Sequence, residues 1–100
     1  MEKSKSLGQI TDIHNNVWDI SVKTGLIHPI HKKVCFRHEV ANKPGYHRYS
    51  YVDFYLTWVA GAGHIQILSG LWSNSVHETS TLSLDILLQM IEIAKKELLE

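Results

Sequence analysis

The spacing of apolar residues along the chain changes near residue 81. Before this point, short runs alternate apolar and polar residues with a period near two, as in strands with one buried face. After it, apolar residues recur every three or four positions to the end of the chain, as along one side of a helix. This pattern predicts an α+β fold: an antiparallel sheet of about four to six strands within residues 9–72, packed by one C-terminal helix over about 82–99. The centre of the helical stripe consists of Leu84, Leu87, Leu88 and Ile91.

The first two predicted strands flank Asn15-Asn16, a pair that tolerates the positive φ of a two-residue hairpin turn. A strict two-residue turn would place Asp12 opposite Asp19, where like charges repel. We therefore expect either a bulge that shifts the register or a cation shared by the two carboxylates, and we favour the bulge.

The length of 100 residues, of which 44% are apolar, suits one domain with a single core. Residues 1–7 are mostly charged and polar, so we expect a flexible tail followed by a single domain over 8–100. These residues lack the apolar run of a signal peptide, and no stretch approaches the roughly 18 apolar residues of a membrane span. Cys35 is the only cysteine, which favours a reducing compartment. We expect a cytoplasmic protein that does not bind membranes.

The predicted helix carries more apolar surface than one packed face requires. An arc beside the central stripe adds further apolar side chains, and it fits either deep burial in a twisted sheet or contact with a second copy. Both interpretations remain open, and of the two we predict the homodimer. The predicted dimer contact consists of Leu82, Ile86, Met90 and Ile93.

Four residues at short spacings, His28, His31, Cys35 and His38, are of the types that bind zinc. However, Cys35 and His38 are three positions apart on an expected strand, so their side chains should point to opposite faces. The doubled C-x2-C or H-x3-H pattern of a structural zinc site is also missing. We predict no metal and no other cofactor, and these four residues are the candidate ligands if that prediction is wrong.

The middle of the chain is basic and its end is acidic, although the formal net charge is zero. Residues 23–48 contain six lysines and arginines against one glutamate, whereas 78–100 contain five acidic residues against two lysines. A neutral total argues against a nucleic-acid-binding domain, which is usually strongly basic. Tyrosine and arginine side chains are frequent anchors of protein interfaces. The candidate partner-binding residues are Lys32, Lys33, Arg37, Tyr46, His47, Arg48, Tyr49 and Tyr51.

No catalytic, cofactor or nucleic-acid motif occurs at its required spacing. The glycine-rich segment 61–63 lacks the Lys-Ser/Thr ending of a phosphate loop and follows a strand without opening a helix. We therefore expect a small non-enzymatic module that binds another protein and acts by steric occlusion. An immunity protein or a phage-encoded inhibitor of a bacterial defence complex would fit this description. The alternatives are a metal- or cysteine-dependent enzyme that uses Cys35 and the neighbouring histidines, and a nucleic-acid or nucleotide binder that uses the basic segment 23–48.

Overall fold

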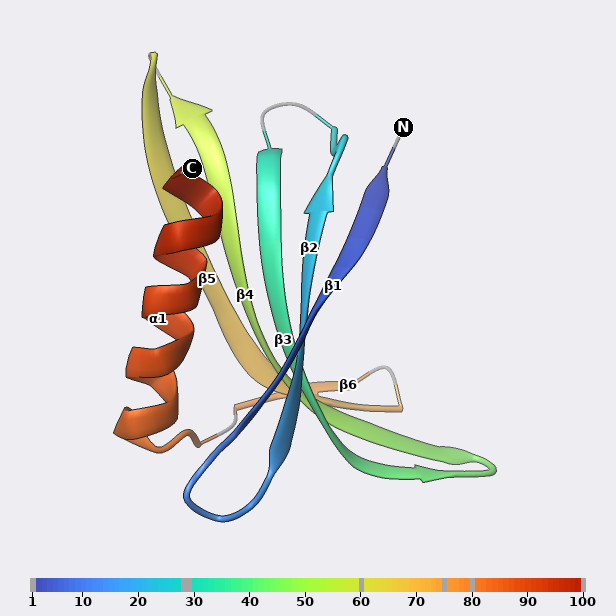
Figure 1. Cartoon of the computed structure of the whole chain (residues 1–100). Helices are drawn as coiled ribbons and strands as arrows, with labels where there is room; N and C mark the ends of the chain where they lie inside the picture. Colours follow the sequence, from blue (N-terminus) through green and yellow to red (C-terminus); the bar gives the residue numbers. More distant parts are fainter. Residues whose placement is uncertain (1, 28–29, 60, 75, 80, 100) are drawn as a thin grey trace.

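The computed structural model describes residues 2–27, 30–59, 61–74, 76–79 and 81–99. Over these residues it contains a six-stranded antiparallel sheet and one C-terminal helix, which confirms the predicted α+β fold (Figure 1). The strands lie side by side in sequence order, so every connection between neighbouring strands is a hairpin. The elements are β1 (Lys3–Thr11), β2 (Val17–Thr24), β3 (Ile30–Lys43), β4 (Tyr46–Val59), β5 (Ala62–Ser73), β6 (Val76–Glu78) and α1 (Leu84–Leu99).

Strand β1 begins earlier than the hydrophobic pattern predicts. It starts at Lys3, which pairs with Thr24 of β2, so most of the segment expected to be a flexible tail, residues 1–7, belongs to the sheet. Pairing with β2 satisfies the backbone groups on one side of this segment, although its side chains lack the alternation of a half-buried strand. Leu7 provides its contact with the core.

The first hairpin turns through residues 12–16, a longer loop than the two-residue turn that we predicted. Within this loop the Asp12 carboxylate accepts the backbone N–H of Asn16 at 2.9 Å, which stabilises the turn. Gln9, and not Asp12, lies opposite Asp19 and donates its side-chain amide to that carboxylate at 2.7 Å. The two aspartates are therefore not cross-strand neighbours, and the predicted bulge between them is not needed.

The core lies between α1 and one face of the sheet, which we call the helix face (Figure 1). The buried residues of α1 are spaced four apart, at Ile86, Met90, Ala94 and Leu98. The helix begins after Ser83, whose hydroxyl accepts the backbone N–H of Ile86 at 3.3 Å as an N-cap. The sheet contributes the alternate, inward-pointing residues of β2, β3 and β4: Trp18, Ile20, Val22, Val34, Phe36, Val52, Phe54 and Leu56.

The buried side of α1 is the side that the sequence pattern suggested for a dimer contact. Ile86 and Met90 are fully buried in the core, and the other two predicted contact residues are partly buried against it. The predicted homodimer contact is therefore wrong, because the sheet of the same chain already covers its central side chains. Two residues of the stripe that we expected in the core lie at the surface instead: Leu84 is 70% exposed and Leu88 is 54% exposed. The predicted dimer contact was Leu82, Ile86, Met90 and Ile93.

Candidate functional site

The side of the sheet opposite α1, which we call the open face, brings together residues from three adjacent strands. Its side chains are the odd-numbered residues of β2 and of most of β3 and β4, because the even-numbered ones fill the core. The register places Arg37 of β3 opposite Tyr51 of β4, and Trp72 of β5 opposite Tyr49 of β4. The register therefore brings together residues that lie 14 and 23 positions apart in the sequence.

Four aromatic side chains of the open face form one cluster, which we call the aromatic cluster: His47, Tyr49, Tyr51 and Trp72. Tyr49 is its centre, since its ring stacks on Trp72 with 5.2 Å between centroids and 21° between planes. His47 lies 5.4 Å from Tyr49 and 5.5 Å from Trp72, and Tyr51 meets Tyr49 edge-on at 6.2 Å. Such ring pairs each contribute about 0.5–1.5 kcal/mol beyond their buried area, so the rings hold one another in place.

A cation completes the cluster on the side of β3. The Arg37 guanidinium lies 4.9 Å from the centroid of the Tyr49 ring, within the range of a cation–π contact. Tyr49 is thus held between Trp72, from the strand on one side of β4, and Arg37, from the strand on the other. The result is a row of contacting side chains across three strands.

Gly70 provides the room for Tyr51. A Cβ atom at residue 70 would lie 2.8 Å from the Tyr51 hydroxyl oxygen and 3.1 Å from Cζ of that ring. Both distances are shorter than ordinary van der Waals contact, so the Tyr51 ring can lie over β5 only because residue 70 has no side chain. The glycine is therefore part of the architecture of the aromatic cluster.

The charges of the open face balance one another. The register places Lys23, Lys33 and Arg37 on it together with Asp19, Glu39 and Asp53. One of these acids, Glu39, lies 3.4 Å from His47 of the aromatic cluster. The basic character of residues 23–48 in the sequence does not produce a positive surface here, because acids from the same and neighbouring strands lie among the bases.

Beside the aromatic cluster lies a polar group made of the buried residues Cys35 and Asp53 and the partly buried Lys33. Asp53 is 6% exposed, with one carboxylate oxygen 3.9 Å from Lys33 Nζ and the other without a hydrogen-bond partner. Burial raises the pKa of Asp53, and this outweighs the opposing effects of Lys33 and of the hydrogen bond from Cys35. For Lys33, burial would lower the pKa, but the charges of Cys35 and Asp53 outweigh it and raise the pKa.

The same surroundings decide the chemistry of Cys35. Burial and the neighbouring Asp53 raise the pKa of its thiol to about 11, and the side chain is 2% exposed. The thiolate is the nucleophilic form of cysteine, so a buried thiol with this pKa is inert near neutral pH. The surroundings of Cys35 therefore do not activate its thiol.

The candidate zinc ligands do not gather at one place. Cys35 belongs to the open face, whereas His38 lies on the helix face, where its ring is 5.6 Å from Trp18 and its Nδ1 is 3.0 Å from the Val17 carbonyl oxygen. His31 is at a bulge in β3, and His28 lies outside the described residues. Among the residues whose positions are described, no group of three or more His, Cys, Asp or Glu side chains is arranged to hold a metal ion.

The predicted partner-binding residues divide between the two faces. Lys33, Arg37, His47, Tyr49 and Tyr51 share the open face. The remaining three, Lys32, Tyr46 and Arg48, point to the other side of the sheet.

Two residues of this second group have structural partners. The Lys32 ammonium donates a hydrogen bond to the Glu97 carbonyl in the last turn of α1, where a cation complements the helix dipole. Arg48 lies 3.6 Å from Glu78 of β6.

The sequence analysis did not identify Trp72 as a site residue. Its importance comes from pairing with Tyr49, and local sequence does not reveal the register between strands. The alternation of β5 could have indicated which face it shares.

Comparison with known proteins identifies no relative: no protein-family model matches the chain, and neither a curated protein nor a solved structure matches it. Within the part of the chain that the structure describes, no helix combines the length and apolar character needed to cross a membrane.

Proposed function

We propose that this chain is a protein-binding module that docks through its open face, with the aromatic cluster and Arg37 at the centre of the contact. The observation that carries the proposal is the position of Tyr49 between Trp72 and Arg37. Aromatic and arginine side chains dominate the energy of protein interfaces, and side chains that are already ordered lose little entropy on binding. The side chains of this surface therefore already have, in the free protein, the arrangement that binding would use.

Two features favour a protein over a nucleic acid as the partner. A base could stack on Tyr49 only by displacing Trp72 or Arg37, which already lie against its ring. In addition, the acids on the open face offset its bases, whereas binding to phosphates depends on a local excess of Lys and Arg.

Binding of this kind would act by steric occlusion, because a docked face covers whatever surface of the partner it contacts. No covalent step is required, which agrees with the inert state of the Cys35 thiol. An inhibitor that blocks an active site or an assembly surface is the simplest biological role for such a module.

The test compares two arginines on opposite faces of the sheet. Tagged wild-type protein is used to capture partners from a lysate of the source organism, and the partner identified by mass spectrometry is then purified for calorimetry. Arg37→Ala should weaken that complex more than tenfold, because truncating a central interface residue typically costs about 2 kcal/mol or more. Arg48→Ala, its matched control on the other face, should bind like the wild type.

Melting curves of both variants establish that the fold is intact. Equal loss of affinity in the two variants, or loss with Arg48→Ala alone, would place the binding surface elsewhere. A labelled single-stranded oligonucleotide tests the alternative directly. Tight binding with a steep salt dependence that disappears in Arg37→Ala would favour the nucleic-acid function over this proposal.

A further inference from the structure

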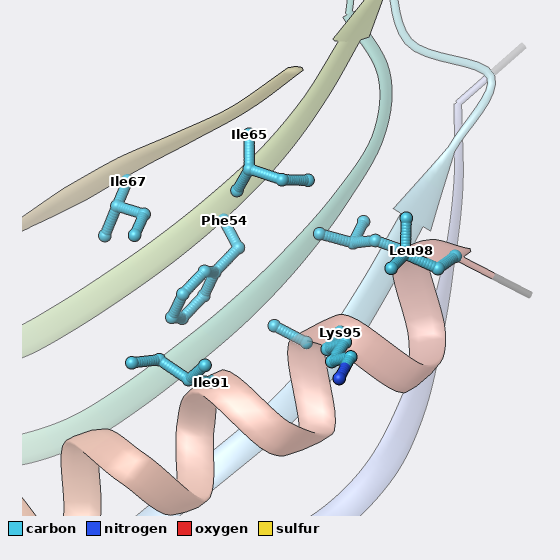
Figure 2. A pocket seen from close by; sticks show the side chains of 8 residues that line it. Phe54, Ile65, Ile67, Ile91, Lys95 and Leu98 are labelled. Atoms are coloured by element: carbon cyan, nitrogen blue, oxygen red, sulfur yellow. The ribbon is translucent and has the colours of Figure 1, made fainter. Parts of the chain in front are cut away.

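A second, purely apolar surface runs along α1 and β5, on the helix face and away from the aromatic cluster. We call it the apolar seam, and Figure 2 shows its centre, with Ile65 and Ile67 of β5 facing Ile91 of α1 across Phe54. A groove of about 190 Å³ separates the two elements here, and Lys95 is the charged residue among those that line it. The exposed residues of the seam are Leu84, Leu88, Ile91 and Leu99 of α1 with Ile65 and Ile67 of β5.

The apolar seam is large enough to form part of an interface. Its six residues are between 38% and 70% exposed. Contiguous apolar patches of about 300–600 Å² are the largest on typical monomers and often mark binding sites. A stable interface of standard size buries about 800 Å² per partner, so the polar rim of the seam would supply part of the contact.

The two edges of the sheet differ in how they are protected. The outer edge at β1 carries Lys3 and Lys5 and a bulge between Ser6 and Gly8, all features that discourage pairing with another strand. At the other edge, no described residue pairs with β5 over residues 63–69, because β6 pairs only with residues 71–73. This stretch has no lysine, arginine, acid or proline. An edge of this kind is normally covered by another element, and it adjoins the apolar seam.

The arrangement of apolar and charged residues on α1 indicates which molecule would cover the apolar seam. Leu84, Leu88, Ile91 and Lys95 are spaced four, three and four apart, the spacing of a helix that packs along another helix. Asp85 lies near the start of this stripe and Lys95 near its end. When two copies of the helix run antiparallel, Leu88 of one lies opposite the partner's Ile91, and Lys95 lies beside the partner's Asp85. The surface is thus complementary to itself.

We propose that a second copy of this chain covers the apolar seam in a two-fold symmetric dimer. The α1 helices pack antiparallel through Leu88 and Ile91, and the two β5 edges lie along the same contact. A closed two-fold contact uses the same patch on both copies, as this self-complementary surface requires. The open faces stay uncovered, so the dimer does not depend on the proposed function and would present two copies of the aromatic cluster.

The first experiment measures mass in solution by light scattering over a range of protein concentrations. The wild type should show twice the chain mass of 11.4 kDa. Ile67→Lys and Leu88→Glu should weaken the dimer at least tenfold, because each places a charge at the centre of the apolar contact. Val40→Lys is the matched control, since Val40 is 49% exposed on β3 outside the seam, and it should remain dimeric. All of these positions are exposed, so the monomer fold should tolerate them.

The second experiment tests the antiparallel arrangement by exchanging charges. Asp85→Lys alone and Lys95→Glu alone should each weaken the homodimer by bringing like charges together. A mixture of the two variants should form a heterodimer by native mass spectrometry, because each new charge then meets its opposite on the partner. Failure of the mixture to associate better than either variant alone would overturn the antiparallel dimer.

A mass of 11.4 kDa at every concentration would overturn the proposal, as would equal dissociation of Ile67→Lys and Val40→Lys. A monomeric wild type that binds phosphatidylcholine vesicles or an apolar fluorescent dye through Ile67 would assign the seam to a different occupant, and would also overturn it.

Discussion

Replacing Gly70 with alanine should destabilise the protein by displacing Tyr51 from the aromatic cluster. The backbone at residue 70 has an ordinary φ, so alanine adopts it without strain, and the effect comes from contact alone. The added Cβ would lie 2.8 Å from the Tyr51 hydroxyl oxygen, 3.1 Å from Cζ and 3.0 Å from the Glu78 carbonyl oxygen. Restoring ordinary contact requires the Tyr51 ring to move by about half an ångström, and Tyr51 packs on Tyr49.

The magnitude follows from two opposing effects. Adding a methyl group to a packed site typically costs about 1–3 kcal/mol. Replacing glycine by alanine also lowers the entropy of the unfolded chain, which stabilises the fold by about 0.4–1 kcal/mol. The net loss should be about 1–2 kcal/mol, which corresponds to a decrease in Tm of roughly 4–16 °C for a domain of this size. Urea unfolding followed by tryptophan fluorescence measures this difference directly.

A double-mutant cycle distinguishes the proposed contact from a general effect of alanine at residue 70. With Tyr51→Ala in the background, the Cβ no longer meets the ring and only its contact with the Glu78 carbonyl oxygen remains, so Gly70→Ala should cost clearly less than in the wild type. The coupling energy between the two substitutions should be at least about 0.5 kcal/mol, the lower end of the range measured for residues in contact. The same loss of stability in both backgrounds would show that Tyr51 does not cause it, and would refute the reasoning.

Three further outcomes are expected from the buried groups. Ile86→Ala should lower the unfolding free energy by about 2–5 kcal/mol, because this side chain of α1 is fully buried against the sheet. Gln89→Ala on the exposed side of α1 should change it by less than about 0.5 kcal/mol. Cys35, with its pKa raised to about 11 by burial, should react with a thiol reagent at pH 8 roughly a hundredfold more slowly than the same protein in urea. Asp53 has its pKa raised by burial, so its contribution to stability is present below its ordinary pKa and is lost as the pH rises through the raised value. Asp53→Asn should therefore gain stability relative to the wild type as the pH rises above 3.8, the ordinary pKa of an aspartate.

For each of these three predictions, a specific result would contradict it. Equal effects of Ile86→Ala and Gln89→Ala in urea unfolding would contradict the observed orientation of α1. Rapid modification of Cys35 in the folded protein would show that its thiol is reactive and would favour the cysteine-dependent enzyme as the function. A stability difference between Asp53→Asn and the wild type that stays constant over the pH range would show that the buried carboxyl has an ordinary pKa.

Much of the fold was predictable because it depends on local patterns. The change from a period of two to helical spacing marks the passage from sheet to helix, and Pro44-Gly45 marks the turn between β3 and β4, where Gly45 has a φ of 77°. Part of the open face was also predictable, since Tyr49 and Tyr51 share a face by alternation alone. What alternation does not provide is which residues of other strands lie beside them.

The orientation of α1, that is, which of its sides is buried, could not be predicted from local sequence patterns. Apolar residues cover so much of its circumference that several orientations would bury a similar area. The sequence pattern placed Leu84 and Leu88 in the core and left Ile86 and Met90 either deeply buried or in contact with a second copy. The structure buries Ile86 and Met90 instead. Burial is a property of the assembled surface, so the sheet decides which arc it can accept.

The sequence by itself thus determined the succession of strands and helix, the turn between β3 and β4, the single core and the aromatic and basic residues concentrated near Tyr49. The tertiary structure alone decided that Arg37 and Trp72 hold Tyr49 between them, that acids balance the bases of the open face, and that the apolar seam lies at an unprotected edge. The physical reason is the range of the forces involved. Backbone propensity and hydrophobic period act over a few residues, whereas strand register, charge balance and packing join residues that are far apart in the chain.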